Sequence, residues 1–550
     1  MKINIKQVSS LEKIRANDEL NHGEIYKKSV LAGERFSYQI SMQSPEYLYF
    51  VDVSLESSLK DNIKLYLVKD AHMDAPVTEK VEMEDYITHE PGLMPDILIP
   101  LEETNNRLSV GDRNCTIWVK IDIPKDAAPG IYPIEVKLSV GVPNEEITEV
   151  ICKTMSVEVI PVAMPEQKLI YTRWFYADCI AVTHNVEIFS EEHWRLIDQY
   201  IAAAADVGIN MILVPIHTPP LDTEIGTKRP CVQLVDIEKK GNQYEFSFEK
   251  FKRFINICKK NGIKYFEMAH MFSQWGAKCA PNIQVAENGK IVDMFGWHVA
   301  ADAPEYIDFL VQYISAVSQE LRKEGISENT YFHISDEPTL ENIDTYKHAS
   351  QIIRPLIGKS KTIDALSSIA FYEQGLVECP VTCVTHIHEF LKREIENQWT
   401  YYCCTPQEVF TNSYMAMPSY RTRILGFLLY KYNIKGFLHW GFNFYNAFVS
   451  AYPINPYLTT SSDRRLPSGD PFIVYPSKEG CYPSIRGEVT YEAIQDMNIC
   501  FALEKQIGRE QVVQLIDKAA ERNLRFDDYP RNKEFLENLR EKMIELLKKS

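Results

Sequence analysis

The pattern of apolar and polar positions changes once along the chain, near residue 165. Before that point, short runs rich in Val, Ile, Tyr and Phe alternate with polar residues, as half-buried strands do. Turn signals such as Pro129–Gly130 separate these runs. We therefore predict an antiparallel β-sandwich over residues 1–163. Its strands are expected over residues 29–43, 47–57, 63–70, 115–124, 131–140 and 151–161.

After the segment 161–167, apolar runs alternate with amphipathic helical patterns. Apolar strands that alternate with helices are typical of a parallel sheet covered on both faces. Eight such units favour an α/β fold with a (β/α)8 barrel over residues 168–507. A doubly wound sheet is the alternative, but no glycine-rich phosphate turn follows the first strand. The expected strands are 169–178, 209–216, 263–272, 331–338, 361–367, 381–388, 400–406 and 434–445, and the expected helices are 191–206, 249–261, 304–324, 341–356 and 418–431.

The last segment, residues 508–550, is charged and has apolar residues at helical spacing over 535–549. We expect a C-terminal helical segment that packs on the outside of the barrel.

Composition narrows the class of protein. The 550 residues carry 59 Lys and Arg against 76 Asp and Glu, a formal charge of −17, and we found no basic run with interleaved aromatic residues. Nucleic acid is therefore not an expected partner. The sequence contains no run of 18 apolar residues, so we expect no membrane span. The amino terminus lacks the apolar stretch of a secretion signal, which predicts a cytoplasmic location, although a chain trimmed of its signal would look the same.

The active site of a (β/α)8 barrel lies at the C-terminal ends of its strands. Polar and aromatic residues at the predicted strand ends make a plausible sugar site. His386 and His388 share one face of a predicted strand, but spacing identifies no third ligand, and the 12 dispersed Cys lack paired CxxC spacing. We therefore expect no metal and no cofactor. The candidate substrate-binding residues are Arg173, His270, His388, Tyr401, Trp440, Asn443 and Tyr445.

The sharpest candidate chemistry is the adjacent pair Asp336 and Glu337, which ends an apolar strand before Pro338. Successive strand residues face opposite ways, so both acids can reach one pocket only where the strand becomes irregular. Pro338 biases Glu337 toward an extended backbone and favours such a strand end. The pair can supply an acid/base carboxyl beside a charge-stabilising carboxylate. The structural alternative is that Asp336 or Thr339 caps the following helix while Glu337 is solvated.

Several motifs together resemble one enzyme family. The Ser-Asp-Glu-Pro motif at 335–338 resembles the Asp-Glu signature of glycoside hydrolase family 123. The stretch 436–445 resembles the last barrel strand of that family, and 469–476 and 484–488 are similar to the domain of unknown function 4091. Residues 129–132 look like part of the sandwich that precedes such barrels. The resemblance spans nearly the whole chain.

The resemblance implies a glycosidase, a β-N-acetylgalactosaminidase that retains the anomeric configuration by a substrate-assisted mechanism. The 2-acetamido oxygen of the sugar attacks the anomeric carbon, Asp336 stabilises the acetamido group, and Glu337 is the general acid/base. An internal nucleophile removes the need for a second carboxylate across the ring. We expect burial and the charge of Asp336 to raise the pKa of Glu337.

Two other hypotheses stay open from the sequence. One is a two-carboxylate glycosidase of other specificity, in which Glu337 is the acid and the nucleophile is Glu267, Asp364 or Glu389. The other is a non-catalytic carbohydrate-binding protein that keeps the barrel. Both share the expectation of a carbohydrate ligand.

Overall fold

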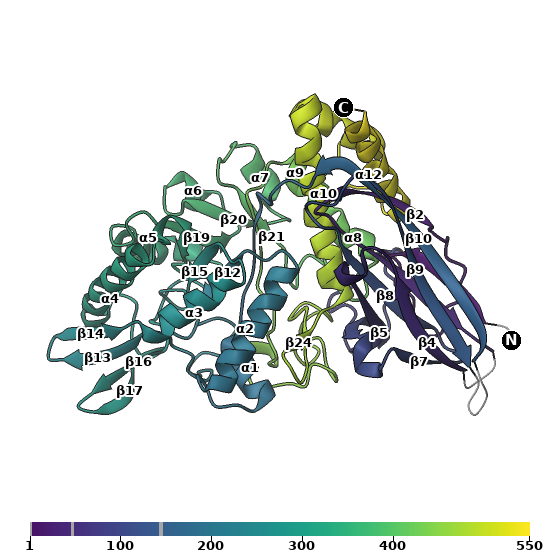
Figure 1. Cartoon of the computed structure of the whole chain (residues 1–550). Helices are drawn as coiled ribbons and strands as arrows, with labels where there is room; N and C mark the ends of the chain where they lie inside the picture. The colour runs from purple at the N-terminus through teal and green to yellow at the C-terminus, as the bar shows by residue number, and fades with distance from the viewer. Residues whose placement is uncertain (1–2, 46–48, 142–146, 550) are drawn as a thin grey trace.

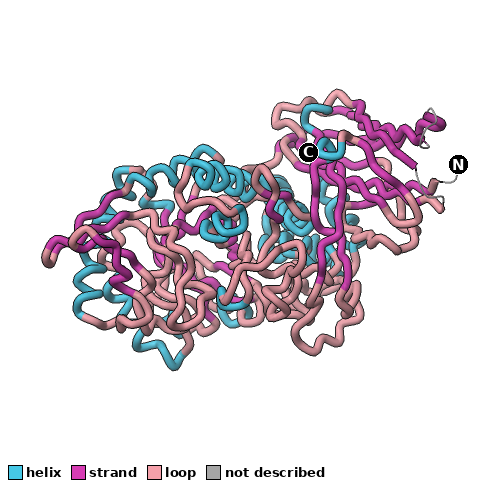
Figure 2. The backbone as a smooth tube through the Cα atoms, turned by 90° about the horizontal axis from the view of Figure 1, so that it is seen from below, coloured by secondary structure: helices cyan, strands magenta, loops and turns pink. Residues whose placement is uncertain are grey.

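The protein, described by a computed structural model over residues 3–45, 49–141 and 147–549, is elongated (Figure 1). A β-sandwich forms one end, and a barrel with C-terminal helices forms the rest. Figure 2 shows the same division, with long strands gathered at one end of the chain trace. The α/β fold with a sandwich and a (β/α)8 barrel is as predicted.

The sandwich contains two five-stranded sheets. All its strand pairs are antiparallel except β10 and β2, which pair in parallel and depart from the purely antiparallel prediction. The expected strand over 47–57 is β4, although residues 47 and 48 lie outside the described residues. One sheet has the order β1 (Asn4–Ser9), β3 (Arg35–Gln43), β8 (Cys115–Asp122), β5 (Ile63–Met73) and β6 (Gly92–Pro100); the other has β2 (Lys27–Ala32), β10 (Ile147–Ala163), β9 (Gly130–Gly141), β4 (Tyr49–Glu56) and β7 (Arg107–Val110).

Eight parallel strands close the barrel in chain order, and the first strand pairs with the last. Each lies inside one of the predicted apolar runs or within two residues of it. The observed strands are shorter, because the apolar runs continue into the loops at the C-terminal ends. The strands are β11 (Ile170–Arg173), β12 (Met211–Val214), β15 (Tyr265–Met268), β18 (Thr330–Phe332), β19 (Lys361–Leu366), β20 (Cys379–Cys383), β21 (Trp399–Tyr401) and β22 (Gly436–His439).

Helices follow the strands as the amphipathic pattern predicts, with two differences. The expected helix 418–431 is divided into α8 and α9, and the expected strand 381–388 ends at Cys383, so His388 lies in helix α7. The helices of this part of the chain are α1 (Ala177–His184), α2 (Glu191–Asp206), α3 (Glu249–Lys260), α4 (Pro304–Lys323), α5 (Ile343–Ile353), α6 (Ala370–Glu373), α7 (Ile387–Leu391), α8 (Ser419–Arg423) and α9 (Leu425–Lys431).

Two of the loops at the C-terminal ends of strands carry extra β-structure. The connections after β12 and β15 supply β13 (Asp236–Lys240), β14 (Gln243–Ser247), β16 (Ile283–Glu287) and β17 (Lys290–Phe295), which form one four-stranded sheet. Figure 1 shows this sheet at the end of the molecule opposite the sandwich. A two-residue pair, β23 (Tyr475–Pro476) and β24 (Cys481–Tyr482), follows the last barrel strand.

The C-terminal helices are α10 (Ile485–Ile507), α11 (Arg509–Ala520) and α12 (Lys533–Lys548). We predicted packing on the barrel, but α12 also contacts the sandwich, where Arg540 pairs with Glu34 and Lys548 pairs with Glu158. The last helix therefore joins the sandwich to α10. In the described part of the chain, no helix is both long and apolar enough to cross a membrane.

Candidate active site

Asp336 and Glu337 lie beyond the end of β18, where the backbone is irregular. Glu337 has φ of 42°, a left-handed conformation that is uncommon for residues other than glycine. The extended conformation that we expected from Pro338 is therefore wrong, but the irregular strand end is present. Non-glycine residues in sparsely populated backbone regions concentrate at functional sites, because the surrounding structure must hold them there.

Glu337 is held by one hydrogen bond. The hydroxyl of Tyr401, at the end of β21, donates to its Oε1 over 2.6 Å. Tyr401 is buried, whereas Glu337 is exposed. The burial that we expected for Glu337 is thus not found. The carboxyl group faces solvent from a fixed position, as a group that exchanges protons with substrate and water must.

Asp336 is half-buried, and its main-chain oxygen accepts a hydrogen bond from the Trp275 amide over 2.9 Å. Burial, followed by the charges of Glu337 and Asp222, raises the pKa of Asp336 well above its ordinary value. Among the described residues, no side chain donates a hydrogen bond to its carboxylate. The Asp336 carboxylate is therefore available to a ligand.

A charged network lies directly beneath this pair. His333, three residues before Asp336, contacts Glu267 through Nε2 over 2.8 Å and Asp364 through Nδ1 over 3.2 Å, and none of the three is exposed. Hydrogen bonds to Asp364 and Glu267 outweigh desolvation and raise the pKa of His333 to about 9. The ring is thus an imidazolium between two carboxylates at neutral pH.

Two of the alternative nucleophiles, Glu267 and Asp364, belong to this network. Glu267 also accepts hydrogen bonds from Thr172 and from the Trp174 indole, and Asp364 also accepts one from Tyr346. Both carboxylates are wholly buried and committed to these partners. The third alternative, Glu389, is exposed on α7. We conclude that neither Glu267 nor Asp364 is arranged as a nucleophile opposite Glu337.

His270, His333 and Asp364 bring three potential metal-ligand atoms within 4.8 Å of one another. The rings of His270 and His333 are stacked with their centroids 4.1 Å apart and their planes at 16°. Imidazole lone pairs lie in the ring plane, so two stacked rings cannot both direct lone pairs at one ion. Both nitrogens of His333 also contact carboxylates. These residues therefore do not fit a metal ion.

The structure brings only some of the predicted sugar contacts to the acid pair. Tyr401 binds Glu337, and the half-buried Trp440 donates its indole N–H to Asp470 over 2.8 Å. His270 is buried under the site. His388 instead pairs with Asp527 of the C-terminal segment over 3.3 Å.

The other three predicted contacts are buried and bonded to the protein. Arg173 donates to Tyr171 and to the main-chain oxygen of Gly441. Tyr445 donates to the main-chain oxygen of Val474. Asn443 bonds both main-chain groups of Tyr176 and so positions that residue. Asn443 and Tyr445 are thus bonded to protein groups, whereas Nη2 of Arg173 is buried without a hydrogen-bond partner in the described structure.

Sequence reasoning missed three residues at the site. Asp222 interacts electrostatically with Asp336 and Glu337, Tyr176 donates to Asp222, and Trp275 is 45% exposed beside the Asp336 backbone. Asp222 and Trp275 belong to long loops without periodicity or a motif. The signal that could have found them is loop length alone, since long loops after barrel strands build active sites.

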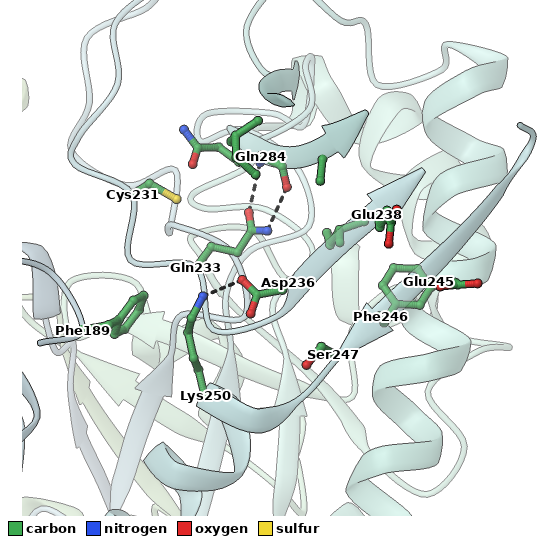
Figure 3. Close-up of a pocket in the computed structure, with 13 residues that line it drawn as sticks. Phe189, Cys231, Gln233, Asp236, Glu238, Glu245, Phe246, Ser247, Lys250 and Gln284 are labelled. Carbon is green, nitrogen blue, oxygen red and sulfur yellow. Dashed lines mark hydrogen bonds and ion pairs between the residues drawn. The ribbon is translucent and has the colours of Figure 1, made fainter. Parts of the chain in front are cut away.

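A cavity of about 590 Å³ lies apart from this site, against the four-stranded sheet (Figure 3). Phe189, Asp236 and Lys250 line it, and Lys250 pairs with Asp236 over 2.5 Å. Neither Asp336 nor Glu337 is among its lining residues. The acid pair, rather than this cavity, is the candidate catalytic centre.

An acid pair at the C-terminal end of a barrel strand can supply acid/base chemistry. Residues 174–503 match the model of the family described as "Glycoside hydrolase 123, catalytic domain". The chain therefore belongs to glycoside hydrolase family 123, which confirms the resemblance inferred from its motifs.

One solved structure agrees in fold over nearly the whole chain. A family 123 glycoside hydrolase from Clostridium perfringens, described in a study of glycolipid glycan hydrolysis, superposes with a TM-score of 0.75 at 16% identity, covering 99% of this chain and 97% of that one. A family 5 mannosidase from Rhizomucor miehei gives a TM-score of 0.35 at 12% identity over 63% of this chain and 94% of that one. No curated protein sequence matches the chain significantly.

Proposed function

We propose that this glycoside hydrolase removes terminal β-linked 2-acetamido sugars, as a β-N-acetylgalactosaminidase, by substrate-assisted retention. The observation that carries the proposal is the adjacency of Asp336 and Glu337 at one strand end, with Tyr401 bonded to Glu337 over 2.6 Å. Glu267 and Asp364, which could have been separate nucleophiles, are sequestered by His333.

In the first step, the carbonyl oxygen of the 2-acetamido group attacks the anomeric carbon. The bond from that carbon to the leaving oxygen breaks, and Glu337 donates its proton to the leaving oxygen. The sugar becomes a bicyclic oxazolinium ion. Asp336, as an anion, accepts a hydrogen bond from the acetamido N–H and stabilises the positive charge.

In the second step, Glu337 is a carboxylate and takes a proton from water. The water oxygen attacks the anomeric carbon and opens the oxazolinium ring. Two inversions at this carbon leave the β configuration unchanged. Glu337 is protonated again at the end, so the cycle balances.

Proton placement within the pair follows from electrostatics. Burial, followed by the charges of Glu337 and Asp222, raises the pKa of Asp336 and favours its neutral form in the free enzyme. A positive charge on the acetamido group favours the anion at Asp336, which leaves the proton on Glu337. The raised pKa of Asp336 in the free enzyme is therefore compatible with its role as an anion in the transition state.

A second candidate is a two-carboxylate glycosidase with Asp222 as the nucleophile. Asp222 is favoured over the other acids because it interacts electrostatically with both members of the pair. The charge of Asp222 raises the pKa of Asp336, and the charge of Glu337 raises the pKa of Asp222. Such an enzyme would also hydrolyse sugars that lack the acetamido group.

The test is hydrolysis of aryl 2-acetamido-2-deoxy-β-galactoside and of its N-trifluoroacetyl analogue. A weaker internal nucleophile should slow the analogue strongly, and a thiazoline mimic of the intermediate should inhibit. Glu337→Gln should lower kcat by at least about 10²–10⁴. Glu394→Gln is a matched control, since Glu394 is also exposed with φ of 50°. Equal rates for the two substrates would exclude the internal nucleophile.

A further inference from the structure

Asp222 is a third carboxyl group at the acid pair, and its position follows from main-chain contacts. It lies in the long loop after β12 with φ of 47°. Gln274 donates to the main-chain oxygen of the next residue, Thr223, over 2.9 Å. Trp275, which follows Gln274, donates to the main-chain oxygen of Asp336 over 2.9 Å. Two consecutive residues thus connect the Asp222 loop to the catalytic strand end.

Charge interactions agree with this placement. Burial is the largest cause that raises the pKa of Asp222 to about 6, and the charge of Glu337 adds to it. In turn, the charge of Asp222 raises the pKa of Asp336. These interactions agree with the connection that Gln274 and Trp275 make between the two segments. Asp222 therefore borders the same space as the pair.

The Asp222 residue is held by two hydrogen bonds from other parts of the chain. The hydroxyl of Tyr176 donates to its Oδ2 over 3.1 Å, and both main-chain groups of Tyr176 are fixed by Asn443. The Ser450 hydroxyl donates to the main-chain oxygen of Asp222 over 2.6 Å. Its carboxylate is thus fixed before any ligand binds.

Arg229 offsets part of the Asp222 charge without neutralising it by direct contact. Its guanidinium pairs with Asp178 at 3.3 Å and lies 5.0 Å from the centre of the Tyr176 ring. Within the described residues, the Asp222 carboxylate has a hydrogen-bond donor only at Oδ2. Asp222 is half-buried, so the second oxygen, Oδ1, remains for a ligand. This oxygen is not among the buried atoms that lack a partner, so it is accessible to a ligand hydroxyl.

We infer that Asp222 is a substrate-binding residue that accepts a hydrogen bond from a ring hydroxyl of the sugar bound at Glu337. This inference rests on the proposed function for the identity of the sugar, but not for the placement of the carboxylate. Neutral pyranoses offer hydroxyl donors around the ring, and a carboxylate is the strongest acceptor that a protein provides for them. Asp222 would hold the ring while Asp336 and Glu337 act on the acetamido group and the glycosidic oxygen.

The experiment uses Glu337→Gln full-length protein, so that ligands bind without turnover. Calorimetry measures the affinity of methyl β-galactopyranoside and of the methyl β-glycoside of N-acetylgalactosamine. Adding Asp222→Asn to the Glu337→Gln protein should weaken the binding of both ligands by roughly 10- to 100-fold. This is the contribution of one hydrogen bond to a charged group. Asp463→Asn is the matched control, because Asp463 also has a left-handed backbone and accepts a hydrogen bond from a tyrosine hydroxyl, that of Tyr452. It should leave both affinities unchanged.

Unchanged affinity in the Asp222→Asn protein overturns the inference. A covalent glycosyl adduct on Asp222, trapped by a 2-fluoro glycoside, also overturns it, because Asp222 would then be the nucleophile. Should Asp222→Asn fail to fold, Tyr176→Phe replaces it and is expected to weaken binding less, by a few fold; no weakening overturns the inference. Failure of the proposed function is distinct: the wild-type protein would not hydrolyse 2-acetamido glycosides, whatever the affinities show.

Discussion

The hydroxyl of Tyr401 donates a hydrogen bond to Oε1 of Glu337 over 2.6 Å, and it joins the ends of two strands, β21 and β18, that are not neighbours in the barrel. Tyr401 is buried and Glu337 is exposed. A rigid residue thus fixes the orientation of the proposed acid, which would otherwise be free to rotate in solvent.

Tyr401→Phe should lower kcat by about 10- to 100-fold, because it removes one hydrogen bond to a charged group. The protein should fold normally, since the phenyl ring keeps its packing. Tyr402→Phe is the control, because it removes the hydroxyl of the next residue, whose ring packs against His439. Steady-state kinetics with an aryl glycoside measures both; equal losses in the two variants would contradict the role of Tyr401.

The acidic limb of the pH profile of kcat/KM should lie above the ordinary range of a carboxyl group. Burial is the largest cause that raises the pKa of Asp336, and the charges of Glu337 and Asp222 add to it. The proposed mechanism uses Asp336 as an anion, so activity should appear as the pH rises through this raised pKa. Asp222→Asn removes a negative charge and should move the limb to lower pH. A limb that stays in place would contradict this electrostatic account.

His333 should make stability depend on pH between neutrality and about pH 9. Its pKa is raised from 6.5 to about 9 in the folded protein. A raised pKa contributes stability that is fully present below 6.5 and is lost as the pH rises through 9, on the order of 3 kcal/mol. Denaturant unfolding across this range measures the loss, and ¹⁵N NMR should find the ring doubly protonated at pH 8. A neutral ring at that pH would refute the prediction.

Asn443→Ala should destabilise the protein by about 1–3 kcal/mol, because it leaves the buried main-chain N–H of Tyr176 without its partner and leaves the C=O with the Ile180 amide over 3.4 Å. It should also weaken substrate binding, since Tyr176 holds Asp222. Asn446→Ala is the control in the same loop, because the Asn446 side chain contacts only the Cys179 sulfur in the described structure. Thermal unfolding with kinetics distinguishes them; equal melting temperatures would contradict the prediction.

The barrel and the acid pair could be predicted from the sequence because both depend on local pattern. Eight apolar runs separated by amphipathic helices indicate a parallel barrel, and a strand that ends in Asp336 and Glu337 before Pro338 places acids at its active edge. The order of the motifs along the chain also indicated the family. The β-sandwich could be predicted in the same way, from the alternation of apolar and polar residues before residue 163.

The sequence alone could not decide which polar residues at the strand ends meet the substrate, because burial depends on contacts between distant segments. Tyr445 is polar near a strand end, yet its hydroxyl donates to the main-chain oxygen of Val474. His388 faces the C-terminal segment, since the helix α7 begins where a strand was expected. Asp222 reaches the acid pair only because hydrogen bonds hold a loop without periodicity against its neighbours. Local pattern determined the scaffold and its acids, and the tertiary packing of the loops decided which side chains surround them.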